Sequence, residues 1–124
     1  MILNLTDLSN EPLQSQIYRQ IRTMILAGDL NAGEMLPSIR GLARNEKVSV
    51  ITVQRGYEIL EKEGLIVSRR GKGFFVAELH VDRKKELSEE RFIEKIEPII
   101  QLATEEGMTI EGIEKILLKI LKSK

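Results

Sequence analysis

The sequence has no cysteine, no tryptophan and only one histidine among its 124 residues. Without cysteine the chain can form neither a disulfide framework nor a thiolate zinc site, and it has no thiol nucleophile. The single histidine, His80, is poor evidence for a metal site without cysteines nearby. No nucleophile, base and orienting group occur together in the sequence. We therefore expect no metal, no cofactor and no catalytic activity.

Long apolar runs are also missing. No run approaches the ~20 apolar residues that a membrane-spanning helix needs, and the N-terminus lacks the basic start and cleavage pattern of a secretory signal. These absences predict a cytoplasmic protein without a membrane partner. The apolar content of 42% and the charged content of 31% are typical of a soluble folded chain. At this length we expect one domain with a small appendage.

The formal net charge is zero, but the charges are unevenly distributed. From Ser38 to Val76 there are eight cations and four carboxylates, a net charge of +4, whereas Met1 to Pro37 has a net charge of −2. A basic segment on a neutral protein indicates a surface for a polyanion, although clustering of this size also occurs by chance. The cations of this segment are Arg40, Arg44, Lys47, Arg55, Lys62, Arg69, Arg70 and Lys72.

Residues 13–25 are predicted to form a long first helix. Their apolar side chains recur at spacings of three and four, which gives one continuous stripe. Pro12 is tolerated at a helix start, and Gly28 suits the left-handed conformation at a helix end. We expect this helix to support the core.

Two further helical patterns follow, separated by a short turn. Ser38 can cap a helix of about two turns, and Ser49 can cap a longer helix that ends before Gly64. This spacing is typical of a helix-turn-helix. The inner stripe of the longer helix is expected to be Val50, Val53, Tyr57 and Leu60. Near its N-terminal end, the exposed face offers groups that can approach base edges and phosphates, namely Ser49, Ile51, Thr52, Gln54 and Arg55.

Two β-rich runs, 65–68 and 74–77, flank the sequence Arg69-Arg70-Gly71-Lys72-Gly73. The glycines allow a tight reversal, so we predict a hairpin whose cationic tip can lie along a phosphate backbone. Gly71-Lys72-Gly73 lacks the longer glycine loop and following helix of nucleotide-binding sites, which argues against a nucleotide ligand. Tyr57 and Phe74 are expected to pack in the core or against the hairpin.

The last part of the chain is expected to be a charged connector, residues 80–86, followed by two short amphipathic helices. The first is predicted to begin at Ser88, to kink at Pro98 and to end at Gly107, and the second to begin after Thr109. This helical hairpin has more apolar surface than it can bury on itself, so we expect a partner. The inward residues are predicted to be Phe92, Ile96, Ile99, Ile100 and Ala103, then Ile110, Ile113, Leu117, Ile120 and Leu121.

Several spaced motifs occur in order between residues 10 and 77. They are Leu36-Pro37-Ser38-Ile39-Arg40-Gly41-Leu42-Ala43, Val48-Ser49, Thr52-Val53, Arg55, Leu60-Glu61, Glu63-Gly64-Leu65-Ile66 and Arg70-Gly71-Lys72-Gly73-Phe74-Phe75-Val76. This set closely resembles the GntR family of bacterial transcription regulators, and the short tail resembles its YtrA subfamily. The resemblance implies an α+β fold, with a winged helix-turn-helix over residues 1–78 and a two-helix dimerisation tail over residues 79–124. It also implies a homodimer that represses transcription at a palindromic double-stranded DNA operator, for example that of a transporter operon.

The resemblance also assigns individual residues. It implies DNA contacts by Ser38, Arg40, Ser49, Thr52, Arg55, Arg70, Lys72 and Gly73, to which the charge and exposure pattern adds Ile51, Gln54 and Arg69. Dimerisation is expected to use Phe92, Ile96, Ile99, Ile100, Ala103, Ile113, Leu117 and Ile120.

The chain departs from the family pattern at a few positions. Val50 replaces a basic or polar residue, and Lys47 replaces a turn glycine, which predicts a left-handed residue there. Gly56, inside the longer helix, predicts the close approach of a neighbouring helix at some cost in helix propensity.

Two other hypotheses remain open. A protein-interaction module could use the same scaffold, although such a surface would more often expose aromatic and aliphatic anchors. A small-molecule effector is not indicated, because about 45 residues after the hairpin leave little room to enclose a ligand. An effector would have to bind at the dimer interface or between the helical hairpin and the DNA-binding part.

Overall fold

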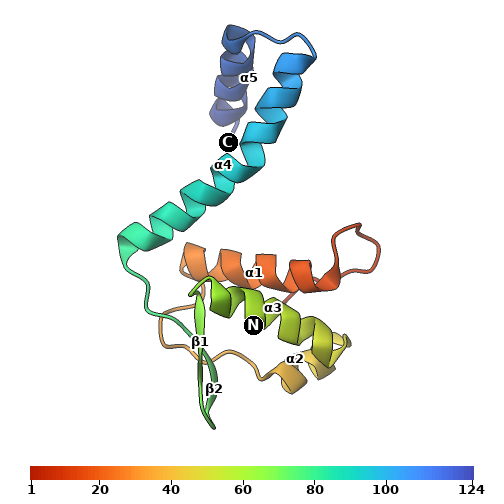
Figure 1. The fold of residues 1–124 in the computed structure, drawn as a ribbon, viewed down its shortest axis with the longest axis vertical. Coiled ribbons are helices and arrows are strands. Elements are labelled where there is room, and N and C mark those ends of the chain that lie inside the picture. The colour runs from red at the N-terminus through yellow and green to blue at the C-terminus, as the bar shows by residue number, and fades with distance from the viewer. The chain divides into compact units, whose positions relative to one another are not determined.

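The computed structural model describes residues 1–124 and contains five helices and one two-stranded antiparallel sheet (Figure 1). The chain divides into two compact units, residues 1–80 (the N-terminal unit) and residues 81–124 (the C-terminal unit). The predicted α+β fold is confirmed: a helix-turn-helix with a hairpin wing is followed by two helices. The elements are α1 (Leu13–Ala27), α2 (Ile39–Glu46), α3 (Val50–Lys62), β1 (Ile66–Arg69), β2 (Gly73–Val76), α4 (Val81–Glu105) and α5 (Ile110–Lys122).

The core of the N-terminal unit lies where α1 packs against α3. Ile17, Ile21 and Ile25 are fully buried on one face of α1, which confirms the predicted stripe. A Cβ atom at Gly56 of α3 would lie 3.1 Å from Ile17 Cγ2 and 3.3 Å from the Gln14 carbonyl oxygen. Glycine at this position therefore allows the two helices to approach closely, as the sequence predicts.

Tyr57 connects the helix-turn-helix to the hairpin. Its ring is fully buried and meets the Phe74 ring edge to face, with 5.1 Å between centroids. Its hydroxyl group donates to the Pro37 carbonyl oxygen over 2.7 Å, just before α2 begins. Burial raises the pKa of the Tyr57 hydroxyl above its usual range, so the hydroxyl remains a donor. The predicted core and wing-packing roles of Tyr57 and Phe74 are confirmed.

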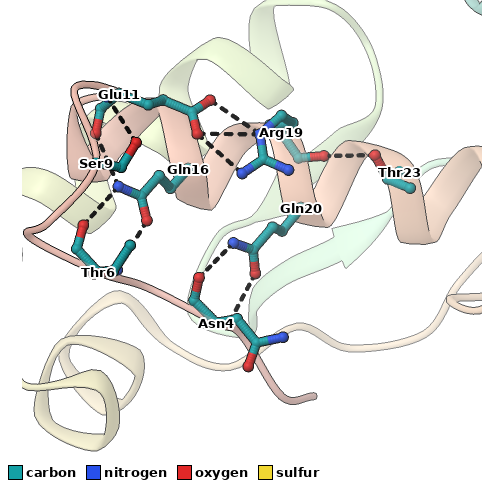
Figure 2. A network of polar contacts seen from close by, with 8 residues as sticks. All are labelled: Asn4, Thr6, Ser9, Glu11, Gln16, Arg19, Gln20 and Thr23. Atoms are coloured by element: carbon teal, nitrogen blue, oxygen red, sulfur yellow. Dashed lines mark hydrogen bonds and ion pairs between the residues drawn. The ribbon is translucent and has the colours of Figure 1, made fainter.

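Two glutamines of α1 hold the segment that precedes this helix (Figure 2). The Gln20 side chain accepts from the N–H of Asn4 and donates to the Asn4 carbonyl, each at 2.8 Å. Gln16 makes the same pair of bonds with Thr6, at 3.0 and 2.8 Å. Residues one helical turn apart are separated by ~6 Å along the axis, close to the ~6.7 Å between alternate residues of an extended chain. The two side-chain amides therefore bond the backbone N–H and carbonyl groups of Asn4 and Thr6, as a neighbouring β-strand would.

Helix α4 differs from the expectation for this part of the chain. It begins at Val81 and has 25 residues, so the predicted connector is helical and this helix is not short. No glycine interrupts it, and the Arg83 guanidinium lies 3.2 Å from the Glu86 carboxylate and 3.7 Å from that of Glu90. The i, i+3 pair of Arg83 and Glu86 stabilises the first turns of α4, which lack the apolar stripe of its later part. Pro98 lies inside α4, and the loss of its backbone donor accounts for the bend of this helix in Figure 1.

Helix α5 begins as predicted, because the Thr109 hydroxyl oxygen accepts the N–H of Gly112 at 3.0 Å. Helices α4 and α5 pack against each other, but none of the residues of α5 is buried. The prediction that ten apolar residues face inward is wrong for half of them, because two helices meet along only one line. Ile96, Ile100, Ala103, Ile113 and Leu117 are half-buried, whereas Phe92, Ile99, Ile110, Ile120 and Leu121 are exposed. Neither α4 nor any other helix has an apolar stretch that would span a bilayer.

Candidate nucleic-acid interface

The start of α2 exposes Ser38 and Arg40. Ser38 is extended, with φ −63° and ψ 156°, and its Oγ accepts the N–H of Gly41 at 3.0 Å. A Cβ atom at Gly41 would lie only 2.8 Å from Ser38 Oγ, so glycine leaves room for the cap. The capping bond uses the serine as an acceptor, and its hydroxyl hydrogen remains able to donate outward.

The turn between α2 and α3 depends on one left-handed residue. Lys47 has φ 56° and ψ 44° and is the only non-glycine residue with a positive φ. The next N–H, that of Val48, donates to the Ala43 carbonyl at 3.0 Å and closes the end of α2. The left-handed conformation predicted at Lys47 is confirmed, and it brings Ser49 to the start of α3 after two further residues.

The N-terminal end of α3 is exposed. Ser49 Oγ accepts the N–H of Thr52 at 3.1 Å and lies 2.7 Å from Thr52 Oγ1. Thr52 is half-buried, whereas Ile51, Gln54 and Arg55 are exposed. The opposite side of the helix is buried against the core, so these side chains cannot turn inward.

The prediction that Val50 faces inward is wrong. The pattern places it on the inner stripe of the third helix, but it is 40% exposed. Helical side chains lean towards the N-terminus, and Val50 is the first residue of α3, so its side chain extends past the core. Its position directly after the Ser49 cap was the signal that could have identified it as exposed. We call Ser38, Arg40, Ser49, Val50, Ile51, Thr52, Gln54 and Arg55 the reading face.

The wing, residues 66–76, carries its cations at the tip. Its strands pair antiparallel up to Arg69 opposite Gly73, and Lys72 N–H donates to the Arg69 carbonyl at 2.9 Å to close the turn. Arg70 and Lys72 lie within this turn and are exposed. The Arg69 guanidinium lies 4.8 Å from the centroid of the Phe75 ring and is thus held against the strand. The predicted hairpin is confirmed, and its turn leaves Arg70 and Lys72 free to move towards a phosphate.

The wing is anchored to α3 and to the segment before α2. The Glu61 carboxylate accepts from both the N–H and the hydroxyl of Ser68, at 3.2 and 2.8 Å. On the other strand, Leu36 N–H donates to the Phe74 carbonyl at 2.9 Å. These bonds fix the wing relative to the reading face. Glu61 is one of the four carboxylates between Ser38 and Val76, and its hydrogen bonds to Ser68 hold it within the N-terminal unit.

Four exposed cations of α2, α3 and the wing turn have no carboxylate partner. Arg40, Arg55, Arg70 and Lys72 are exposed and form no ion pair in the structure. Unpaired cations can displace counterions from a phosphate backbone without first breaking an internal bond. The carboxylate of Glu58, one turn beyond the start of α3, instead accepts from the Gln54 amide at 3.1 Å.

The C-terminal unit has two apolar grooves lined by residues of α4 and α5, with Ile100, Ile113 and Leu117 in both linings. The first groove has a volume of about 270 Å³ and the second about 300 Å³. The second differs by having Thr104 and Glu114 in its lining. Seven of the eight residues expected to form the dimer contact line the first groove, namely Ile96, Ile99, Ile100, Ala103, Ile113, Leu117 and Ile120. Phe92 lies outside both lining sets and is 63% exposed.

Comparisons with known proteins agree with this architecture. The family model described as "Bacterial regulatory proteins, gntR family" matches residues 13–76. The chain is 34% identical over 110 residues to the uncharacterized HTH-type transcriptional regulator YhcF of Bacillus subtilis, which covers 86% of this chain and 90% of that protein. It is 37% identical over 70 residues to the HTH-type transcriptional repressor YtrA of Bacillus subtilis, or 56% of this chain and 54% of that protein. A solved GntR family transcriptional regulator from Listeria monocytogenes is 31% identical and has a TM-score of 0.77, covering 90% of this chain and 96% of that chain.

Proposed function

This chain belongs to the gntR family of bacterial regulatory proteins and is a DNA-binding transcriptional regulator, and we propose that it represses transcription by binding a palindromic operator as a homodimer. Its relatives and its fold are those of transcription regulators and not of enzymes. The named repressor among these relatives, YtrA of Bacillus subtilis, supports the repressor role. A bacterial operator as the partner implies a cytoplasmic protein.

The observation that carries the proposal is the composition of the reading face and of the wing tip. Serine hydroxyls cap the N-terminal ends of α2 and α3, and the exposed cations Arg40 and Arg55 on these helices form no ion pair. Helix N-termini attract phosphate oxygens through their free N–H groups and the helix dipole. The tip residues Arg70 and Lys72 extend this set of phosphate ligands. We assign DNA contacts to Ser38, Arg40, Ser49, Ile51, Thr52, Gln54, Arg55, Arg69, Arg70, Lys72 and Gly73.

The homodimer is supported by the first groove of the C-terminal unit. The groove is lined by apolar side chains alone, and Ile99 at its edge is 66% exposed in the single chain. Exposed apolar surface of this kind is unfavourable in water unless a partner covers it. In a two-fold dimer, the first groove of each chain is covered by the same groove of the other chain, because such an interface uses the same surface of both copies. The dimer should place two α3 helices about 34–36 Å apart, one turn of B-DNA.

Mobility shifts on DNA upstream of the chain's own gene, at several salt concentrations, test the DNA contact. If Arg40, Arg55, Arg70 and Lys72 of both protomers each neutralise a phosphate, the logarithm of the association constant should fall with the logarithm of salt with a slope of about −7. Arg55→Ala should weaken specific binding at least about tenfold while leaving fold and dimer intact. Arg19→Ala is the matched control, since Arg19 is an exposed arginine on α1 that pairs with Glu11. Absent or salt-insensitive binding would sink the proposal.

Sedimentation tests the dimer. Ile99→Glu should give a monomer that keeps its fold, because Ile99 has few contacts within its own chain. Leu8→Glu, at a site that is 98% exposed in the segment before α1, is the matched control and should remain a dimer. A chain truncated after Glu78 should also be a monomer that binds a half-site weakly. A truncated chain that still dimerises would show that the C-terminal unit is not the dimer contact. Transcript levels of neighbouring transporter genes in a strain lacking the protein would test the proposed transporter operon.

A further inference from the structure

The reading face contains two aliphatic side chains and one oriented amide. From these we infer that each operator half-site presents a thymine methyl group to Ile51 and Val50 and a nearby adenine to Gln54. The inference rests on the proposed function, because it takes α3 as the helix that enters the major groove. It extends that function from DNA binding in general to a class of base sequence.

Ile51 points directly away from the core. At about 100° per residue around a helix, Ile51 lies roughly opposite the centre of the buried side of α3. Its side chain is 54% exposed, and Val50, one residue earlier and about 100° around the helix, is 40% exposed. The buried side is formed by Val53, Gly56, Tyr57 and Leu60.

The chemistry of these two side chains restricts what they can recognise. An aliphatic group can neither donate to a phosphate nor pair with the polar edge of a base. The major groove displays one apolar group, the C5-methyl of thymine. Ile51 and Val50 are exposed among serine, threonine, amide and guanidinium groups, so covering them with a methyl group removes apolar surface from water on both partners. A guanine or cytosine edge at the same place would lose its hydrogen bonds to water without gaining new ones.

Gln54 is oriented by its neighbour one turn later. Its Nε2 donates to the Glu58 carboxylate at 3.1 Å, which uses one of the two amide hydrogens. The second hydrogen and the Oε1 acceptor remain, and these match N7 and the N6 amino group of adenine. Guanine presents two acceptors in the major groove, which Gln54 cannot match with one donor and one acceptor. Glu58 is thus a positioning residue for this contact.

Selection of binding sites from random duplex DNA with the full-length chain tests the inference. The enriched half-site should contain both a thymine and an adenine at fixed positions. Replacing that thymine by deoxyuridine removes only the methyl group and should weaken binding about fourfold per half-site, as expected for one buried methyl. In Ile51→Ala the affinity ratio between thymine and deoxyuridine should fall close to one. Ile59→Ala, an exposed isoleucine further along α3, is the matched control and should keep the ratio.

The outcomes separate this inference from the proposed function. Suppose that a specific site is enriched, but that replacing its thymine by deoxyuridine leaves the affinity unchanged, or weakens binding equally in the parent protein and in Ile51→Ala. Either result overturns the methyl contact and leaves the regulator assignment intact. A variant Gln54→Ala that keeps the full adenine preference overturns the amide contact. If folded protein enriches no sequence, the proposed operator binding fails and this inference fails with it.

Discussion

Removing the hydroxyl group of Tyr57 should destabilise the N-terminal unit more than its small size suggests. Tyr57→Phe keeps the ring against Phe74 and deletes the 2.7 Å bond to the Pro37 carbonyl. Because Tyr57 is fully buried, water cannot enter to replace the lost donor without displacing packed side chains. The affected carbonyl directly precedes the Ser38 cap, so the variant also loosens the start of α2 relative to α3.

The expected magnitude follows from the cost of a buried acceptor that loses its donor, about 1–3 kcal/mol. Each kcal/mol lowers the thermal midpoint by roughly 4–8 °C in a domain of 60–100 residues, and the N-terminal unit spans residues 1–80. A loss in the middle of this range should therefore be resolved easily by urea or thermal unfolding at neutral pH.

The same substitution should change the response to alkaline pH. Burial raises the pKa of Tyr57 in the folded chain above the value of about 10 expected in the unfolded chain. The folded state then holds the proton more strongly, so this contribution to stability is complete below about pH 10 and is lost as the pH rises towards the folded-state pKa. Phenylalanine does not ionise. The unfolding free energy of Tyr57→Phe should therefore decline less steeply with alkaline pH than that of the parent protein.

Urea unfolding followed by circular dichroism, at neutral pH and at several alkaline pH values, measures both effects. Tyr18→Phe is the matched control, because Tyr18 is the other tyrosine and is half-buried, with its hydroxyl donating to Glu63 at 2.6 Å. Equal unfolding free energies for Tyr57→Phe and the parent at neutral pH would refute the buried hydrogen bond as a source of stability. If the unfolding free energies of Tyr57→Phe and of the parent protein fell equally steeply at alkaline pH, the link between burial and proton affinity would be refuted.

Three further substitutions test other parts of the structure. Lys47→Gly should raise the unfolding free energy by up to about 1 kcal/mol, because glycine adopts the left-handed conformation without a Cβ penalty, and an unchanged urea midpoint would contradict this. Ser49→Ala should cost about 1 kcal/mol of stability and weaken DNA binding, because it removes the cap to Thr52. Ser49→Asp should keep this cap and lose only DNA binding. A DNA affinity of Ser49→Asp equal to that of the parent protein would argue against a DNA contact at Ser49. Replacing both Gln16 and Gln20 by Ala should speed amide hydrogen exchange in the segment before α1, and unchanged protection would show that their side-chain amides do not hold it.

The helix boundaries of the N-terminal unit follow from local chemistry, which explains why the sequence predicts them. A serine cap bonds to an N–H three residues later, as Ser38 does with Gly41 and Ser49 with Thr52, so no distant part of the chain is needed to recognise it. Gly28, with φ 87°, ends α1 for an equally local reason. The exposed face of α3 is predictable because it lies opposite the apolar stripe.

Other features depend on information that the pattern does not contain. The start of α4 at Val81 is preceded by His80 and not by serine, threonine, asparagine or aspartate, and its ion pairs are visible only once the helix is formed. Val50 matches the spacing of the inner stripe of α3. It is the first residue of this helix, however, so no preceding turn covers its side chain. Ile96 and Ile99 are the same residue type three positions apart, yet Ile96 is half-buried and Ile99 is 66% exposed. The way in which α4 and α5 cross decides which of these two isoleucines is covered, and a single sequence does not specify that crossing.

The neutral net charge of the chain makes the C-terminal unit important for DNA affinity even without a DNA contact of its own. The basic segment of one N-terminal unit offers only eight cations, and phosphate contacts contribute in proportion to their number. On the proposed dimer, binding of one reading face raises the effective concentration of the second at its half-site, so two weak contacts act as one strong contact. A substitution in the first groove should then weaken operator binding while leaving the affinity of a single reading face for a half-site unchanged. The same argument explains how a protein without general basic charge can prefer an operator over random DNA. The second half-site contributes to affinity only where its spacing and sequence are both correct.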